Sequence, residues 1–123
     1  MNTPNEANPL FTMPAITGRD IAALQDPRPV CIVGAYDSDE HRSNFATIIW
    51  ATPVSHDPAM VCFALRCASK TMQMIQQTRA CSLCLLPANE RGIELTEICG
   101  GSTGHKVDKA AQVPHTLVSM SGA

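Results

Sequence analysis

Apolar and β-branched residues in the middle of the chain form runs separated by polar breaks, and this pattern predicts a β-rich centre. Candidate strands cover 30–36, 45–51 and 60–65, and the polar run 37–42 predicts a hairpin between the first two. Pro53 is expected to end the second strand. The third run is almost continuously apolar, which is typical of a strand buried on both faces. Because the connections are short, we expect three antiparallel neighbours.

Segments with helical spacing of apolar residues surround these strands, and each begins at a polar capping residue. Thr17 and Asp20 have the spacing of a capping box. Ser69 and Asn89 are good N-cap residues for two further helices. The pair Gly100-Gly101 should stop the last one. The expected helices cover residues 17–25, 69–78 and 90–99.

The order of the elements indicates one α+β domain, mainly β, or a small barrel rather than a doubly wound parallel sheet. A further buried strand is expected at 80–86 and a β-like piece at 115–120. No G-x-G-x-x-G follows a predicted strand, which argues against a dinucleotide-binding fold of that type. We expect residues 1–13 to form a loose N-terminal arm and residues 14–123 to form the domain.

Composition narrows the function classes. The chain has 123 residues and a formal net charge of -2, which gives no reason to expect nucleic acid or an anionic membrane as partner. No apolar run approaches membrane-spanning length, and the polar N-terminus lacks the regions of a signal peptide. The expected compartment is therefore the cytoplasm.

Cysteines are numerous, but their placement does not predict a metal or redox centre. Cys81 and Cys84 have C-x-x-C spacing within the predicted strand 80–86. Side chains three apart on a strand point to opposite faces, so the two thiols should not chelate one metal. We expect them to be small buried residues, and we expect no metal site.

The run Ser69-Lys70-Thr71, with Arg66 just before it, is the strongest local candidate for binding chemistry. A helix N-terminus offers unpaired N–H groups and the positive end of the helix dipole. Hydroxyls and cations gathered there suit a phosphate group. An ordinary capped helix with two solvated cations explains the same residues, and this stretch alone leaves both readings open.

Five motifs occur in order along the middle of the chain, at residues 28–30, Asn44–Trp50, 54–58, 69–71 and 99–109. Taken together they resemble the flavin reductase-like family, which includes flavoredoxin. The resemblance covers about residues 28–109 and implies an FMN-binding split β-barrel. Relatives continue beyond the Asp108-Lys109 pair with strands that close the barrel, so we expect an incomplete barrel here.

The resemblance implies that FMN lies at a homodimer interface, with its phosphate on the helix that begins after Ser69. The segment 44–50 would then follow the ribityl chain and the flavin ring. Ile49 stands where relatives often have Ser, so a hydroxyl contact is lost at that position. No catalytic side chain is implied, because the flavin itself carries out the redox chemistry. The implied cofactor-binding residues are Asn44, Ala46, Thr47, Ile48, Ile49, Trp50, Arg66, Ser69, Lys70, Thr71, Ser102 and His105.

The expected function is that of an FMN-dependent, flavin reductase-like oxidoreductase. Its electron donor would be a reduced nicotinamide, NAD(P)H, or a redox protein. The alternative is a non-catalytic or truncated flavin-binding module in which the donor site is missing. A cysteine-based metal-binding protein is the third class.

Overall fold

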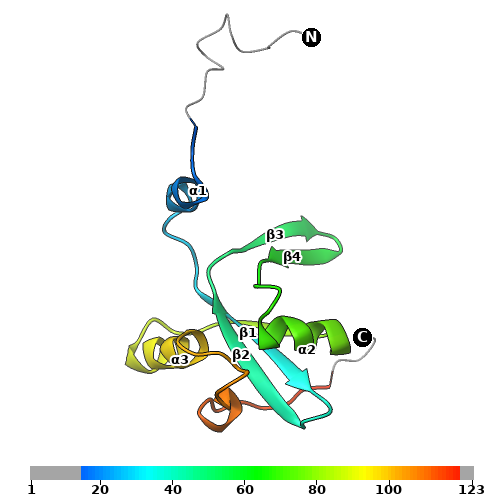
Figure 1. Cartoon of the computed structure of the whole chain (residues 1–123). Coiled ribbons are helices and arrows are strands. Elements are labelled where there is room, and N and C mark those ends of the chain that lie inside the picture. The colour runs from blue at the N-terminus through cyan, green and yellow to red at the C-terminus, as the bar shows by residue number, and fades with distance from the viewer. Residues whose placement is uncertain (1–14, 120–123) are drawn as a thin grey trace, which may run out of the picture.

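The computed structural model describes residues 15–119 and contains two small antiparallel sheets with helices around them (Figure 1). In chain order the elements are α1 (Gly18–Leu24), β1 (Cys31–Asp37), β2 (Arg42–Ile48), β3 (Ala51–His56), β4 (Ala59–Phe63), α2 (Lys70–Thr78), β5 (Ser82–Leu85), α3 (Glu90–Gly100) and the 3-10 turn η2 (Lys109–Ala111). The architecture is therefore mixed α and β, as the sequence predicts.

The larger sheet is built on β1, which lies between β2 and β5. Both neighbours run antiparallel to β1, and the β1–β2 pair continues without a register shift into the polar turn after Asp37. Apart from Tyr36, every residue of β1 is buried. The predicted first hairpin is confirmed.

Helix α2 packs on β1 and β2, and this contact forms the core of the domain. Val33 of β1 and Met74 of α2 have almost no exposed surface, at 0% and 1%. Val33 also packs with Cys31 and Ile48 in one apolar cluster. Burying side chains of this size is worth roughly 1.5–3 kcal/mol each, so this contact is what holds α2 in place.

The predicted second strand, 45–51, is wrong in its extent, because the chain leaves the sheet at Ile49 and Trp50. Beyond this break, β3 pairs with β4 as a separate two-stranded sheet. Pro53 does not end a strand. A register shift between Pro53 and Ser55 accommodates it within β3, as bulges and edge strands do for a residue without an N–H.

The prediction that 60–65 is a strand buried on both faces is also wrong. Met60 and Val61 in β4 keep 51% and 50% of their surface exposed. In Figure 1 the β3–β4 hairpin extends away from the larger sheet, and among residues 15–119 β3 is the one strand that pairs with β4. Apolar character alone could not reveal that the described residues leave this strand exposed.

The later predictions succeed for helices and fail for strand burial. Helices α2 and α3 begin after the expected caps, Ser69 and Asn89. Strand β5 forms but is exposed throughout, since it lies at the edge of the sheet and, in the described part of the chain, pairs with β1 alone. Residues 115–119 form no strand, and Met120 lies outside the described residues.

The cysteines divide into buried and exposed ones, which corrects the expectation for the C-x-x-C pair. Cys84 is exposed and Cys81 is partly exposed. Only Cys31 and Cys99 are buried. Among residues 15–119, no group of three or more His, Cys, Asp or Glu side chains is placed to hold a metal ion.

Helix α1 stands apart from both sheets in Figure 1, with no buried residue of its own. The Thr17–Asp20 capping box is confirmed, with the Asp20 N–H 3.2 Å from Thr17 Oγ1. The expected arm, residues 1–13, lies outside the described residues. Within the described part the sheets do not close into a barrel, and no helix there is long and apolar enough to cross a membrane.

Candidate functional site

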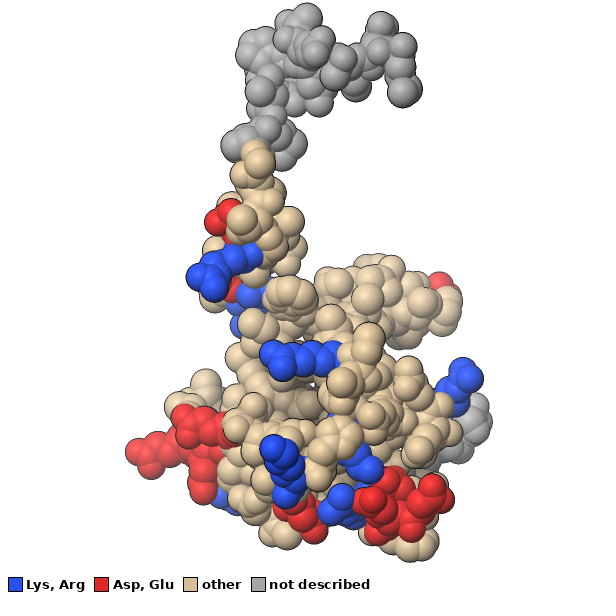
Figure 2. Space-filling model, in the orientation of Figure 1, with Lys and Arg blue, Asp and Glu red and all other residues tan. Residues whose placement is uncertain are grey.

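A cleft of about 950 Å³ opens where β2, the start of α2 and the segment after α3 meet. Its floor is the α2-facing side of β2, and the loop 100–104 forms the opposite wall. Figure 2 shows the hollow in the middle of one face, with Lys and Arg side chains at its border and most carboxylates nearer the edges of that face. Arg28, Arg66, Lys70 and Lys109 line the cleft, and none of its described lining residues is Asp or Glu. The cleft is therefore suited to an anionic ligand.

The start of α2 presents its first N–H groups to this cleft. Ser69 is the N-cap, in extended conformation, and its hydroxyl accepts from the Met72 N–H at 3.0 Å. The N–H groups of Lys70 and Thr71 belong to the first turn and have no acceptor within the helix. Together with the dipole of a nine-residue helix, they form an anion-binding terminus.

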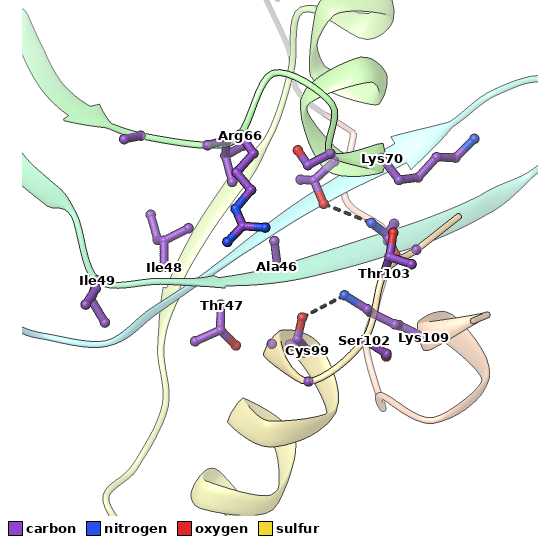
Figure 3. A pocket seen from close by; sticks show the side chains of 18 of the residues that line it. Ala46, Thr47, Ile48, Ile49, Arg66, Lys70, Cys99, Ser102, Thr103 and Lys109 are labelled. Carbon is purple, nitrogen blue, oxygen red and sulfur yellow. Dashed lines mark hydrogen bonds between the residues drawn. The ribbon is translucent and has the colours of Figure 1, made fainter. Parts of the chain in front are cut away.

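Arg66 and Lys70 flank that terminus, but the structure gives their side chains different surroundings. In Figure 3 the guanidinium of Arg66 extends over Ala46 and Ile48 into the cleft, whereas Lys70 points away from it. The Lys70 ammonium lies 3.2 Å from Asp37 Oδ2. The expectation that the Lys70 side chain faces a phosphate is therefore not met in this conformation, because the carboxylate at the end of β1 holds it.

Asp37 is buried at the β1–β2 turn, where its carboxylate is bonded on two sides. Asp37 Oδ1 accepts from the N–H groups of Asp39 and Glu40, at 2.9 and 3.0 Å. These bonds, the Glu40 N–H first, together with Lys70, hold the pKa of Asp37 below its usual range despite burial. Lys70 is thus fixed by a carboxylate that is ionised at neutral pH.

Lys109 is a buried cation that the sequence reading did not place in the site. It is 3% exposed, and its ammonium donates to the carbonyl of Phe45 at 2.9 Å and to that of Cys99 at 2.7 Å. Figure 3 shows the bond to Cys99. Burial lowers the pKa of Lys109, and it raises the pKa of the neighbouring Cys99 thiol. An ammonium has three donors, so one N–H remains for a ligand in the cleft that Lys109 lines.

Asn44 joins the floor of the cleft to α2. Its side-chain amide donates to the Thr71 hydroxyl at 2.8 Å, and the two residues are 5% and 1% exposed. The loop after α3 passes so close that a Cβ on Gly104 would lie 2.4 Å from Asn44 Oδ1. Gly104 is therefore required for the close approach of this loop to Asn44.

Next to Asn44, β2 contributes a small apolar floor. In the register with β1, Ala46 is opposite Val33 and Ile48 is opposite Cys31. Between them Thr47 is turned to α3, where its hydroxyl donates to the Thr96 carbonyl at 2.7 Å. Ala46 leaves room above the floor, and Thr47 fixes the wall that carries the loop 100–104.

Ile49 and Trp50 form the end of the cleft opposite α2, at the break between β2 and β3. Both side chains are largely exposed, at 43% and 53%. The Trp50 carbonyl accepts from the Ala64 N–H at 3.0 Å, which fixes the base of the β3–β4 hairpin. The cleft thus has a polar, cationic end and an apolar end.

The structure brings together all the sequence-predicted site residues except His105. Ser102 lines the cleft. His105 does not; its Nε2 lies 2.9 Å from the Ala68 carbonyl, so it ties the loop to the segment before α2. Arg28, Thr103, Gly104 and Lys109 are lining residues that the prediction missed. The Asp108-Lys109 pair was visible in the sequence, but only burial reveals the importance of Lys109.

These features fit a ligand that has a phosphate at one end and a flat apolar group at the other. The helix start and Arg66 match the phosphate, and the small floor with Trp50 beyond it matches a ring. No carboxylate lines the described cleft to repel a dianion. The cleft volume lies at the upper end of the usual range for small-molecule sites, about 300–1,000 Å³.

Comparison with known proteins identifies the family of the chain. The model of the family described as "Flavin reductase like domain" matches residues 25–121. The flavoredoxin of Desulfovibrio vulgaris (Miyazaki F) aligns with TM-score 0.63 and 26% identity over 71% of this chain and 46% of its own length. The FMN-binding protein from Thermus thermophilus, solved with p-hydroxybenzaldehyde, aligns with TM-score 0.68 and 25% identity over 87% of this chain and 55% of its own.

A third structure shares the fold. Flavoredoxin from Methanosarcina acetivorans aligns with TM-score 0.68 and 21% identity over 84% of this chain and 52% of its own. The chain therefore spans about half the length of these proteins. Among curated proteins, none matches the chain significantly.

Proposed function

Because the chain belongs to the flavin reductase-like family, and flavin-binding redox function follows from that family, we propose that it binds FMN in the cleft between β2 and α2. One observation carries the proposal. The start of α2 and the Arg66 side chain line the same cleft, and none of the described lining residues is Asp or Glu. An FMN-binding oxidoreductase that takes electrons from NAD(P)H or from a redox protein is the finer proposal.

In this proposal the FMN phosphate lies against the first turn of α2. The N–H groups of Lys70 and Thr71, the Ser69 hydroxyl and the Arg66 guanidinium are its donors. Lys70 contributes mainly through its backbone, since its ammonium is paired with Asp37. Charge-assisted bonds of this kind are about twice as strong as neutral ones, so Arg66 is the main electrostatic anchor.

The ribityl chain and the ring would then follow β2 toward Trp50. Asn44, Ala46, Thr47, Ile48 and Ile49 form the adjoining surface, and Ser102 faces it from the opposite loop. Lys109 offers its remaining N–H from beneath. When bound, FMN supplies the hydride and single-electron chemistry. The residues of the chain orient it, hold a positive charge near it and exclude water from one side.

A second copy of the chain is part of the proposal. The hairpin that follows the apolar end of the cleft also carries exposed apolar side chains, among them Val54 and Val61, at 54% and 50%. Exposed apolar surface is typical of an interface when it gathers into a patch. A closed two-fold homodimer would cover the hairpins and the open end of each cleft.

The test compares FMN with riboflavin, which lacks the phosphate. Titration of the purified chain should show that Arg66→Met weakens FMN binding by about 1.5–3 kcal/mol, as loss of a charge-assisted bond does, and changes riboflavin binding far less. Lys70→Ala should cost less than Arg66→Met. The matched control is Arg91→Met, because Arg91 lies on α3 and pairs with Glu94 at 2.8 Å. Equal losses for the two flavins would overturn the phosphate assignment.

A non-catalytic flavin-binding module is the second candidate function. The observation that favours it is that the sheets of the described residues do not close into a barrel. Steady-state oxidation of NADH and NADPH by the FMN-loaded chain separates the two. Turnover that depends on bound FMN supports the oxidoreductase; full flavin occupancy with no turnover for either nicotinamide or a viologen donor supports the module.

A further inference from the structure

Arg28 lies beside Trp50 at the hairpin end of the cleft. The sequence did not predict it as a site residue. Its guanidinium carbon is 5.8 Å from the centroid of the Trp50 ring. Both residues line the cleft. A guanidinium over an indole at this distance makes a favourable cation–π contact.

Asp26 in turn fixes Arg28. The guanidinium contacts one oxygen of Asp26 through two nitrogens, with Nε at 3.1 Å and Nη2 at 2.9 Å from Oδ1. The Arg28 side chain is only 13% exposed, although Asp26 is 60% exposed. A long side chain is thus immobilised between a carboxylate and a ring, which a solvated surface arginine would not be.

Trp50 is placed to gain from such a contact, because about half of its surface is exposed. It lies at the break between β2 and β3 and is 53% exposed. Its backbone is fixed by the bond from the Ala64 N–H to its carbonyl, but this bond leaves the indole free to rotate. The guanidinium of Arg28 lies over the indole ring of Trp50 and can restrict this rotation.

We propose that Arg28, oriented by Asp26, is a positioning residue that holds the Trp50 indole as the wall against which the flat ring of the ligand packs. The inference rests on the proposed flavin site. It adds Arg28 as the residue that prepares the end of the site where the ring binds. Arg66 then selects for the phosphate, whereas Arg28 acts on the ring through Trp50.

The chain has one tryptophan, so its fluorescence reports Trp50 alone. In the ligand-free protein, Arg28→Met should lower the steady-state anisotropy of Trp50 and weaken its near-ultraviolet circular dichroism. Asp26→Asn should do the same to a smaller extent. Arg28→Lys should restore part of the signal, since it keeps the charge but not the planar group. Arg91→Met is again the control and should change neither signal.

Binding provides the second readout. Arg28→Met should weaken FMN and riboflavin equally, by roughly 2- to 30-fold, the range that a cation–π contact supports. A loss confined to FMN would show that Arg28 contacts phosphate instead, and would overturn the inference. Unchanged Trp50 anisotropy in Arg28→Met would overturn it as well.

The two proposals fail in different ways. A wild-type chain that binds no flavin overturns the proposed function and the ring contact, while the ligand-free Trp50 signals still decide whether Arg28 holds the indole. Far-ultraviolet circular dichroism and the unfolding midpoint identify a variant that does not fold. For such a variant, the Arg28→Lys and Asp26→Asn signals decide the question.

Discussion

At the α2 end of the cleft, polar side chains are buried and hydrogen-bonded within the chain, whereas at the hairpin end apolar side chains are exposed. Asn44, Thr71 and Lys109 belong to the first group and Trp50, Val54 and Val61 to the second. Buried polar groups need their partners within the chain, so the first end is formed by the chain alone. The second end keeps apolar area available for a ligand or for a second copy.

The difference separates two kinds of contribution to a binding site. A substitution at the α2 end should lower the free energy of unfolding strongly. A buried donor or acceptor that loses its partner has given up its hydration and has no hydrogen bond in return. The hairpin end is inexpensive to disturb in the isolated chain, and its role would become visible only on binding or assembly. The following changes test this contrast, in order of decreasing expected effect.

The largest effect on the free energy of unfolding is expected for Lys109→Met. Methionine fills much of the same volume but leaves the carbonyls of Phe45 and Cys99 without a donor, at a cost of about 1–3 kcal/mol for each buried group. Urea denaturation measures it. Lys106→Met, at an exposed neighbouring position, is the control. Equal stability of the two variants would show that the buried ammonium is not a structural element.

Thr71→Val should be next, at about 1–3 kcal/mol, because it leaves the Asn44 amide buried without its acceptor. The double variant Asn44→Leu with Thr71→Val should cost less than the sum of the single variants, since both partners are then apolar. Denaturant midpoints of the four proteins give the coupling. Strict additivity would mean that the two side chains do not stabilise each other.

The third expected effect is confined to acid pH. The pKa of Asp37 lies below its usual range in the folded chain, so the unfolded chain binds the proton first as the pH falls. The contribution of Asp37 is therefore complete above about pH 4–5 and is lost as the pH drops through the lowered pKa. Asp37→Asn should flatten the loss of stability over that range, measured as the urea midpoint against pH. Asp39→Asn, at the exposed turn, serves as the comparison.

The smallest effect on stability is expected at the hairpin. Val61→Ser should change the free energy of unfolding by no more than about 0.5 kcal/mol in dilute protein, because Val61 is half exposed. Self-association should nevertheless weaken, together with flavin occupancy, if the hairpins meet in a homodimer. Sedimentation across a dilution series with flavin fluorescence measures both.

Leu85→Ser is the matched control, because Leu85 is 69% exposed on β5 of the other sheet. Its effect on association should be small. A monodisperse monomer that keeps FMN at full occupancy would contradict the homodimer, and equal weakening by both substitutions would remove the hairpin as its interface.

Short-range patterns in the sequence predicted the local elements, and the resemblance to the family predicted most of the residues that line the candidate cleft. The side chains of Thr17, Ser69 and Asn89 each cap a helix by accepting from the N–H three residues later. A few consecutive residues are therefore enough to predict where these helices begin. The hairpin after Asp37 is also local. The expected flavin-binding residues came from the order of motifs that the chain shares with the family. All of them but one line the same cleft.

The burial of side chains, their hydrogen-bond partners and the ends of the strands depend on residues far apart in the chain. Only the folded structure shows them. Met60 and Val61 look like core residues, yet their burial depends on which sheet they join. Lys70 is engaged by Asp37, 33 positions earlier, and Lys109 by Phe45, 64 positions earlier. Hydrophobicity and capping act within a few residues, whereas desolvation and ion pairing follow from the packed arrangement, so only the fold could assign these cations their roles.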